Sequence, residues 1–361
     1  MSATQHNIAI VGGGIMGLSN AFTLLRAGHC ITIFDPAGFP AHNASLMAGG
    51  MLAPYSEIEH MPSEWVEAGL EGIALWRDIV AALPADTIDF HQKGSLFIAH
   101  RDDQYILERF AAHLTQEKAC RRVGQDDIAE LEPQLAARFS SGLYLEQEAH
   151  IYPLQAMQAL CDYLSAQGTT LKTEWADPYK LQEQFDWVID CRGYGAQEQP
   201  LRGVKGELVI VRNEDFALSR PVRLMHPRYP LYIVPRPDHT FMIGATVIES
   251  AEEESVSLRS AMELMSALYA LHSSFGDAQI VDLQAGIRPS YDDNLPRIKV
   301  EGNMLSCNGL FRHGFLLSPF MAACVKDHIE DTQNNFKSSF IIERNNENYN
   351  QRDRQRLHSA A

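Results

Sequence analysis

Three glycines near the amino terminus have a spacing suited to binding phosphate. Gly12, Gly14 and Gly17 fit the pattern G-x-G-x-x-G. The first glycine permits a tight turn, the second lets the backbone approach a pyrophosphate, and the third lets a helix pack closely against a strand. Ile15 and Met16 would open that helix, whose N-terminal end attracts negative charge. We therefore expect these five residues to hold the phosphates of a dinucleotide, although the same glycines could form a turn without a ligand.

A carboxylate follows the glycine motif at the end of the next apolar run. Asp35 comes directly after Cys30–Phe34. An aspartate at this place accepts hydrogen bonds from ribose hydroxyls and repels a 2′-phosphate, which disfavours NADP. The motif and the aspartate together predict a dinucleotide site, but they do not distinguish NAD from FAD.

The elements that must position these residues are a strand, a helix and a second strand. Asn7–Val11 is a short apolar run typical of a buried parallel strand. Ile15–Ala27 has apolar residues at helical spacing, and Gly28 suits the end of a helix. Cys30–Phe34 is the second strand. The first part of the chain is therefore predicted to form a βαβ unit.

The later chain predicts a discontinuous two-domain layout of class α/β. Helical and buried-strand patterns recur up to about residue 205 and again before residue 330, whereas strand patterns dominate from Gly206. We expect a Rossmann-like nucleotide-binding domain with an inserted β-rich (α+β) substrate domain. The nucleotide-binding domain is assigned to residues 1–80, 140–205 and 285–330. The substrate domain is assigned to residues 81–139 and 206–284, and the polar residues 331–361 are predicted to form a solvated tail.

The composition argues against some classes of function. The chain has 46 acidic and 30 basic residues and a net charge of −16, whereas a protein that binds nucleic acid normally presents a basic face. Its apolar runs are shorter than the roughly 18 residues that a membrane span needs. The six cysteines are scattered without a C-x-x-C pair. We therefore expect a cytoplasmic protein with free thiols, no metal site and no nucleic-acid or membrane partner.

Other segments resemble a known family. Residues 44–57, with Gly50-Met51-Leu52-Ala53-Pro54 at their centre, resemble the second flavin-binding segment of the D-amino-acid oxidase superfamily. The resemblance is strongest to the glycine oxidases of thiamin biosynthesis. It continues, in the family's order, through residues 231–236, 243–246, 285–289 and 308–319. Together these segments cover the chain from about residue 7 to residue 330.

The resemblance implies that the dinucleotide is FAD and that two further segments hold it. Small residues beside the flavin would let the backbone lie against the ring, and the N-terminal end of a final helix would stabilise negative charge on the flavin. The cofactor-binding residues expected in these segments are Ser45, Ala48, Gly49, Gly50, Met51, Gly309, Arg312, His313, Gly314, Phe315 and Leu316. The same glycines could serve turn geometry alone.

The resemblance also implies three residues in contact with substrate. Arg288 follows an apolar strand and would bind a carboxylate through its planar fork. Tyr232 matches a family tyrosine whose hydroxyl assists in carboxylate binding, and Arg312 matches an arginine on the substrate side of the flavin. Taken alone, Arg288 could equally form a structural ion pair, and Tyr232 could be an ordinary half-buried strand residue.

The function implied by the resemblance is oxidation of glycine or another small amino acid or amine. A hydride would pass to flavin N5, and the resulting imine would give an oxo acid and ammonia. Dioxygen would then yield hydrogen peroxide, and the product could supply thiamin thiazole synthesis. Alternatives are a sarcosine or D-amino-acid oxidase, a dehydrogenase with another electron acceptor, a tRNA-modifying flavoprotein, and a flavin-holding partner protein without turnover. The family also leads us to expect a homo-oligomer.

Overall fold

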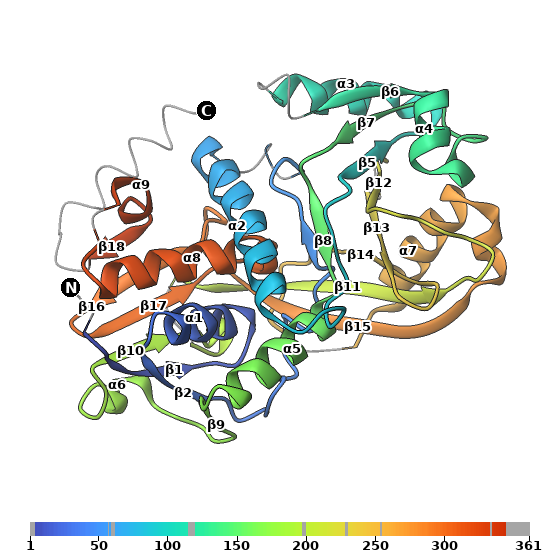
Figure 1. Ribbon diagram of the computed structural model, residues 1–361. Helices are drawn as coiled ribbons and strands as arrows, with labels where there is room; N and C mark the ends of the chain where they lie inside the picture. Colours follow the sequence, from blue (N-terminus) through green and yellow to red (C-terminus); the bar gives the residue numbers. More distant parts are fainter. Residues whose placement is uncertain are drawn as a thin grey trace.

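Two large β-sheets organise the molecule (Figure 1). The computed structural model describes residues 4–56, 58, 62–114, 120–196, 200–227, 230–252, 255–332 and 334–343. A seven-stranded sheet lies with the helices at one end of the molecule, and an eight-stranded sheet forms much of the other end. A small three-stranded sheet of β3 (Met51–Leu52), β8 (Ala149–Ile151) and β4 (Phe90–His91) completes the set within the described residues.

The seven-stranded sheet has the order β18-β16-β17-β10-β1-β2-β9, and every adjacent pair except β16 with β17 is parallel. Its strands are β1 (Asn7–Val11), β2 (Cys30–Phe34), β9 (Thr170–Lys172), β10 (Trp187–Asp190), β16 (Arg297–Glu301), β17 (Met304–Asn308) and β18 (Ile341–Glu343). Ile8 and Ile10 point to one face, where the helices α1 (Ile15–Arg26), α2 (Ser63–Ala82), α5 (Pro153–Ala166) and α8 (Gly314–Ile329) form the main core. Ala9 and Val11 point to the other face, toward α6 (Pro178–Leu181). Both faces are therefore covered, as a parallel sheet requires.

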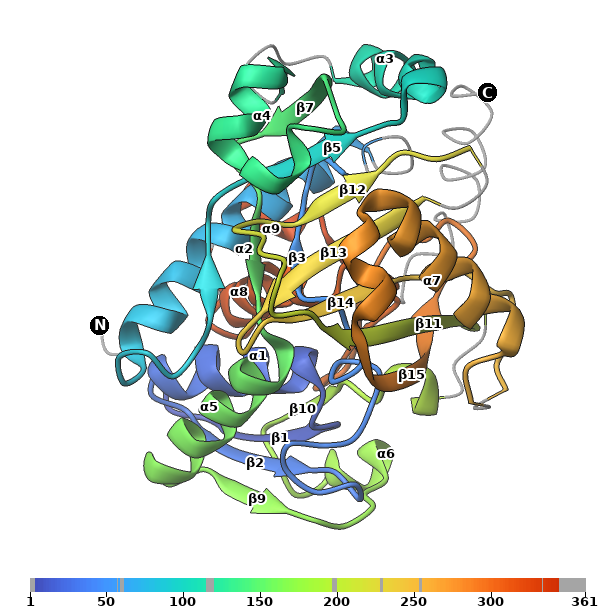
Figure 2. The same cartoon turned by 90° about the vertical axis from the view of Figure 1, so that its right-hand side faces the viewer.

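The eight-stranded sheet has the order β15-β11-β14-β13-β12-β5-β7-β6. Its strands are β5 (Ser95–Ile98), β6 (Arg121–Gly124), β7 (Ser141–Leu145), β11 (Arg202–Arg212), β12 (Val222–Leu224), β13 (Leu231–Arg236), β14 (Thr240–Gly244) and β15 (Gln279–Ser290). Val209, Ile233 and Ile243 lie on one apolar face, which α7 (Leu258–Leu271) covers (Figure 2). Because side chains alternate along a strand, the neighbouring residues Leu208 and Val234 lie on the opposite face. That second face turns toward Met51 and the glycine-rich segment before it.

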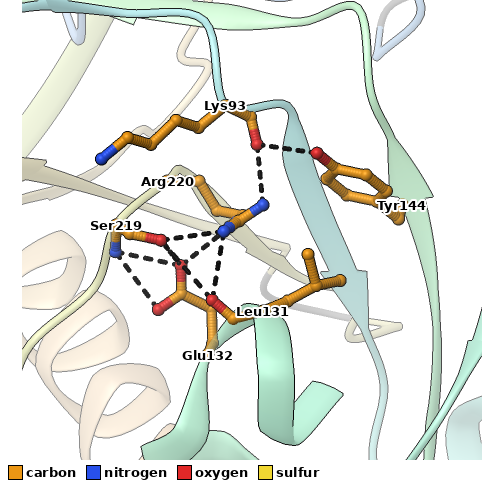
Figure 3. Close-up of polar contacts among 6 residues, drawn as sticks. All are labelled: Lys93, Leu131, Glu132, Tyr144, Ser219 and Arg220. Atoms are coloured by element: carbon orange, nitrogen blue, oxygen red, sulfur yellow. Dashed lines mark hydrogen bonds and ion pairs between the residues drawn. The ribbon is translucent and has the colours of Figure 1, made fainter. Parts of the chain in front are cut away.

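A polar network fixes the junction between β5 and β12, which pair in parallel. Glu132 follows α4 (Gln125–Leu131). Its carboxylate accepts hydrogen bonds from the amide and the hydroxyl of Ser219, and it forms an ion pair with Arg220, whose Nε lies 3.0 Å from a carboxylate oxygen. Arg220 Nη1 and the hydroxyl of Tyr144 both donate to the carbonyl of Lys93 (Figure 3). Since Lys93 precedes β5 and Arg220 precedes β12, the network holds the starts of both strands together.

The prediction of a solvated tail is wrong for residues 334–343. These residues form α9 (Asn335–Ser338) and β18, and β18 pairs with β16 at the edge of the seven-stranded sheet. Phe336 and Phe340 supply the reason, because both rings pack against Phe320 of α8 and Phe340 also packs edge-on against Trp65. Burying these aromatic rings offsets the cost of ordering a polar segment. Residue 333 and residues 344–361 of the predicted tail lie outside the described residues.

The predicted domain bounds remain a proposal. β7 pairs with β5 and β6 in the eight-stranded sheet, although residues 140–205 were assigned to the nucleotide-binding domain. β11 and β15 each run across a predicted boundary, and they pair from Arg202 opposite Ser290 to Arg212 opposite Gln279, with one register shift between Ile210 and Val211. Two of the predicted boundaries therefore fall inside paired strands.

Candidate active site

The glycine turn between β1 and α1 has no room for side chains at two of its glycines. Gly12 has φ +112°, and a Cβ at Gly17 would lie 1.9 Å from the carbonyl oxygen of Gly12. The first turn of α1 contains no acidic residue. The amide of Ile15 donates to Ser45 Oγ at 3.0 Å, which brings the second predicted flavin segment to this helix end. The N-terminal end of α1 thus keeps a positive field suited to phosphate.

Asp35 binds to the same turn. One of its carboxylate oxygens accepts from the amide of Gly13 at 2.6 Å, and the other accepts from the amide of Ala37 at 2.8 Å. A carboxylate has about four lone-pair sites, so these two bonds leave acceptor capacity for a ribose hydroxyl. The structure therefore places Asp35 beside the turn, where it both orders the backbone and can meet a nucleotide.

The second predicted flavin segment lies between the two large sheets. A Cβ built on Gly49 would lie 2.3 Å from Met242 Cε of β14, and Arg236 Nη2 of β13 donates to the carbonyl of Ala48 at 3.0 Å. Gly50 has φ +76°, and a Cβ there would lie 1.9 Å from the carbonyl oxygen of Ile151. These contacts hold Ala48 and Gly49 against the sheet that carries the predicted substrate residues, and Gly50 against β8 of the small sheet.

Arg236 is a cation held beside this segment. Its guanidinium lies 4.9 Å from the centre of the Tyr152 ring, and burial lowers its pKa to about 10. Its Nε is buried without a hydrogen-bond partner. A buried donor left without an acceptor is costly in free energy, so this atom marks a place where an acceptor on a ligand fits.

The third predicted segment joins the starts of α1 and α8. A Cβ on Gly314 would lie 3.6 Å from Ile15 Cγ2, so the two helix ends are neighbours. Phe315 and Leu316 are buried in the core, and the indole N–H of Trp76 donates to the carbonyl of Phe315 at 2.6 Å. These two side chains therefore pack between helices. Any contact that they make with a cofactor would come from the backbone amides of the first turn of α8.

The bend that precedes α8 is also tightly built. Gly309 has φ +78°, and a Cβ there would lie 2.3 Å from the ring of Tyr291. The amide of Phe311 donates to the carbonyl of Pro289 at 2.9 Å, which ties the bend to the residue after Arg288. His313 stands at the N-cap position of α8 and its carbonyl accepts the first helical hydrogen bond, from Leu317. The structure thus joins the bend to the end of β15.

Arg288 and Tyr232 lie on the same face of the eight-stranded sheet. Arg288 stands opposite Val204 on β11, and its guanidinium extends over Gly206, where a Cβ would come within 2.0 Å of Nη2. Arg288 Nη1 donates to the carbonyl of Thr246 at 3.0 Å. Tyr232 stands opposite Gly244 on β14. The strands between these two residues, β11 and β14, carry Gly206 and Gly244 on the same face.

Arg312 brings the third segment to the same face. Its guanidinium carbon lies 6.0 Å from the centre of the Tyr232 ring, within the range of a cation–π contact. The three residues predicted to meet substrate thus lie on or against one sheet face. The predicted cofactor residues line the adjoining helix ends and the segment between the sheets.

FAD fits the arrangement of these residues. Two neighbouring helix N-termini, neither with an acidic residue in its first turn, offer backbone amides to phosphate and to the flavin. The backbone of Gly49 and the guanidinium of Arg236, whose Nε has no hydrogen-bond partner, lie beside the sheet that carries the predicted substrate residues. Among the described residues, no group of three or more His, Cys, Asp or Glu side chains could hold a metal ion. Within that part of the chain, no helix is both long and apolar enough to cross a membrane.

The fold and the site define a flavin-dependent oxidoreductase. Residues 7–328 match the family model of FAD dependent oxidoreductases, DAO, and the chain belongs to this family. The chain is 41% identical over 317 residues to the thiamine biosynthesis oxidoreductase ThiO of Rhizobium etli, covering 87% of this chain and 94% of that protein. It is 27% identical over 362 residues to glycine oxidase of Geobacillus kaustophilus, covering 92% and 95%.

The solved structures agree with this assignment. The crystal structure of glycine oxidase from Geobacillus kaustophilus matches with a TM-score of 0.80 and 25% identity, over 95% of this chain and 99% of that one. Iminodiacetate oxidase from Chelativorans shares the fold, with a TM-score of 0.78 at 18% identity. The predicted fold class, the D-amino-acid-oxidase-type family and the FAD cofactor are confirmed. The roles of the individual site residues stay predictions.

Sequence reasoning missed four residues that the structure places against the predicted site residues. Gly206 and Thr246 shape and orient Arg288, Arg236 holds the segment between the sheets, and Arg223 lies against Tyr232. Arg236 and Thr246 stand inside segments that already resembled the family, so that resemblance was the available signal. Gly206 and Arg223 gave none, because their importance depends on which strands become neighbours.

Proposed function

We propose that the protein oxidises glycine or a similarly small amino acid or amine, and that this reaction serves thiamine biosynthesis. The names of its relatives support this proposal: one is a thiamine biosynthesis oxidoreductase and another is a glycine oxidase. The observation that carries it is the guanidinium of Arg288, held over Gly206 on the face that also presents Tyr232.

Arg288 is the residue that we propose binds the substrate carboxylate. A guanidinium has five N–H donors in a planar fork, so one can bond the carbonyl of Thr246 while others engage a carboxylate. The bond to Thr246 fixes the rotation of the fork before substrate arrives. An arginine ordered in this way loses little further conformational freedom on binding.

Tyr232 and Arg312 complete the proposed substrate site. The hydroxyl of Tyr232 would donate a second hydrogen bond to the carboxylate, and the ring is nearly fully buried at 5% exposure, which restricts its orientation. Arg312 adds positive charge beside the ring, together with the N-terminal end of α8. This field favours an anionic substrate and opposes a cationic one, so the amine would react in its neutral form.

FAD, when bound, supplies the two-electron acceptor for the amine and yields hydrogen peroxide when dioxygen reoxidises it. The protein's own contribution is to orient the substrate and to exclude water. Gly206 serves the first purpose by leaving room for the guanidinium of Arg288, and Gly244 places no side chain opposite Tyr232. No general base is required if the neutral amine binds directly, and the chemistry then depends on position.

The experiment that tests the proposal is anaerobic reduction of the purified holoenzyme. Glycine, sarcosine and D-alanine are each mixed with the protein, and loss of the visible flavin absorbance is followed. We expect glycine to bleach the flavin, and air to restore the colour with formation of peroxide. Flavin that no small amine bleaches would contradict the proposal. If glycine bleaches the flavin but only an added dye reoxidises it, glycine stands as the substrate and dioxygen is not the electron acceptor.

The variant Arg288→Ala tests the carboxylate site. Loss of the guanidinium is expected to raise KM for the amino acid about 100-fold or more, because a charged hydrogen-bond partner is removed from a half-buried site. Arg202→Ala is the matched control. Arg202 lies on β11, opposite Ser290 of the same strand pair, but forms an ion pair with Glu249 at the surface. It is expected to leave KM within about twofold of the parent value.

A further inference from the structure

Arg223 lies within an aromatic box formed by Phe97, Phe110 and Tyr232. It stands on β12 opposite Tyr232 of β13 on one side and opposite Phe97 of β5 on the other. Its guanidinium carbon is 4.8 Å from the centre of the Tyr232 ring, 5.2 Å from that of Phe97 and 5.8 Å from that of Phe110. The closest of the three rings is therefore the one proposed to meet substrate.

The charge of Arg223 is balanced by ring faces and a carbonyl. Its Nη1 donates to the carbonyl of Ser56 at 2.9 Å, and its Nε is buried without a hydrogen-bond partner. The contacts that the structure shows for its guanidinium are this carbonyl and the three rings. An apolar side chain would fill the same box without an unsatisfied donor, so filling space does not account for a guanidinium here.

The carbonyl that binds Arg223 is itself held in place. The amide and hydroxyl of Ser56 both donate to the buried carboxyl group of Glu148, at 2.9 Å each. Ser56 follows the segment that lies between the two sheets, so the position of Arg223 is set from the cofactor side of the site. Arg223 thereby links that side to the ring of Tyr232.

We propose that Arg223 is a positioning residue that fixes the ring of Tyr232, so that its hydroxyl meets the substrate carboxylate. A tyrosine ring turns about two side-chain bonds, and a cation over its face favours the orientation that keeps the face toward the charge. The inference rests on the proposed function, because Tyr232 is assigned to substrate there. It adds a residue that acts through Tyr232 without touching substrate.

The test is a double-mutant cycle on the holoenzyme with Arg223→Met, Tyr232→Phe and the double variant. KM and kcat are measured for glycine, and the Kd of acetate is measured from the change in the flavin spectrum. Arg223→Met is expected to raise KM and the acetate Kd about tenfold and to leave kcat within about twofold, since coupling between neighbouring residues is of this size. The double variant is expected to match Tyr232→Phe, and Arg223→Lys to recover part of the affinity.

Arg121→Met is the matched control, because Arg121 of β6 also lies over a tyrosine ring, 5.6 Å from the centre of Tyr144, away from the predicted site residues. Arg121→Met is expected to change neither KM for glycine nor the acetate Kd. A tenfold loss of affinity that persists when Arg223→Met is added to Tyr232→Phe would overturn the inference. An unchanged acetate Kd in Arg223→Met would also overturn it.

The inference and the proposed function fail in different ways. If Arg288→Ala and Tyr232→Phe weaken acetate binding but Arg223→Met does not, only the positioning role is wrong. If Tyr232→Phe leaves the acetate Kd unchanged, the assignment of Tyr232 to the carboxylate is wrong. If Arg223→Met fails to retain FAD, Arg223→Lys replaces it in the cycle. The inference then requires that the acetate Kd of Arg223→Lys lies above the parent value. It also requires that the double variant Arg223→Lys with Tyr232→Phe has the same acetate Kd as Tyr232→Phe alone.

Discussion

The guanidinium of Arg288 lies across the backbone of Gly206 on the neighbouring strand. The two residues belong to β15 and β11, and a Cβ on Gly206 would come within 2.0 Å of Arg288 Nη2. A side chain at position 206 would therefore occupy the place of the fork. The absence of a side chain on one strand is thus what allows the arginine on the next to lie flat along the sheet.

Gly206→Ala is predicted to weaken substrate binding without loss of FAD. The methyl group must push the guanidinium away from the carbonyl of Thr246, so the fork loses its fixed orientation. We expect KM for the amino acid to rise about tenfold, equivalent to about 1.4 kcal/mol. Steady-state kinetics and the ratio of flavin to protein measure the two effects. Gly195→Ala is the control, because nothing lies within 4 Å of a Cβ at that position; an equal KM for both variants would disprove the steric explanation.

Gly50→Ala is predicted to destabilise the protein and to reduce its FAD content. Gly50 has φ +76°, and its Cβ would lie 1.9 Å from the carbonyl oxygen of Ile151, a backbone atom that cannot turn away. Gly168 provides a matched comparison, because it has φ +87° and open space around a Cβ. Gly168→Ala is expected to cost about 1 kcal/mol of unfolding free energy from the left-handed backbone alone. Gly50→Ala is expected to cost several times more, as measured by urea unfolding.

The stability of the protein is predicted to fall as pH rises because of Glu148. Burial raises the pKa of this carboxyl group from 4.5 to about 7, and this effect outweighs the hydrogen bonds donated by Ser95, Ser56 and Tyr55. The folded state therefore keeps the proton at pH values where the unfolded state has released it. The contribution is complete below about pH 4.5 and is lost as pH rises from 4.5 to 7.

Glu148→Gln removes this titration and keeps an acceptor oxygen for the donors around it. Between pH 5 and pH 8 the unfolding free energy of the parent protein should fall by about 2.5 kcal/mol more than that of the variant. Urea unfolding of both proteins at a series of pH values measures the difference. Parallel pH profiles for the two proteins would show that Glu148 is ionised throughout this range.

Local patterns in the sequence predicted the first βαβ unit almost to the residue. Asn7–Val11 and Cys30–Phe34 are the observed strands, and the helix predicted over Ile15–Ala27 ends at Arg26. These elements are predicted by signals that lie close together in the sequence. The signals are the apolar patterns of the strands and the helix, the glycine turn between them, and Gly28 at the end of the helix. The final helix that the family resemblance implied is also present, as α8 (Gly314–Ile329).

Contacts between distant segments could not be predicted in this way. Gly206 was noted only as the start of a β-rich region, because its role requires knowing that β11 pairs with β15. Arg223 reads as an ordinary charged residue until β12 is placed beside β13. Phe336 and Phe340 are isolated aromatic residues in a polar stretch, and only their packing on Trp65 and Phe320 gives that stretch structure.

The meeting of α1 with α8 has a consequence for the order of events during synthesis. The ends of these two helices lie side by side, yet about 300 residues separate them along the chain. A nascent chain can form the glycine turn early, but it lacks the second of the two helix ends proposed to hold the cofactor until the segment around Gly314 has emerged. We therefore expect stable flavin capture to follow the synthesis of that segment rather than the folding of the first βαβ unit.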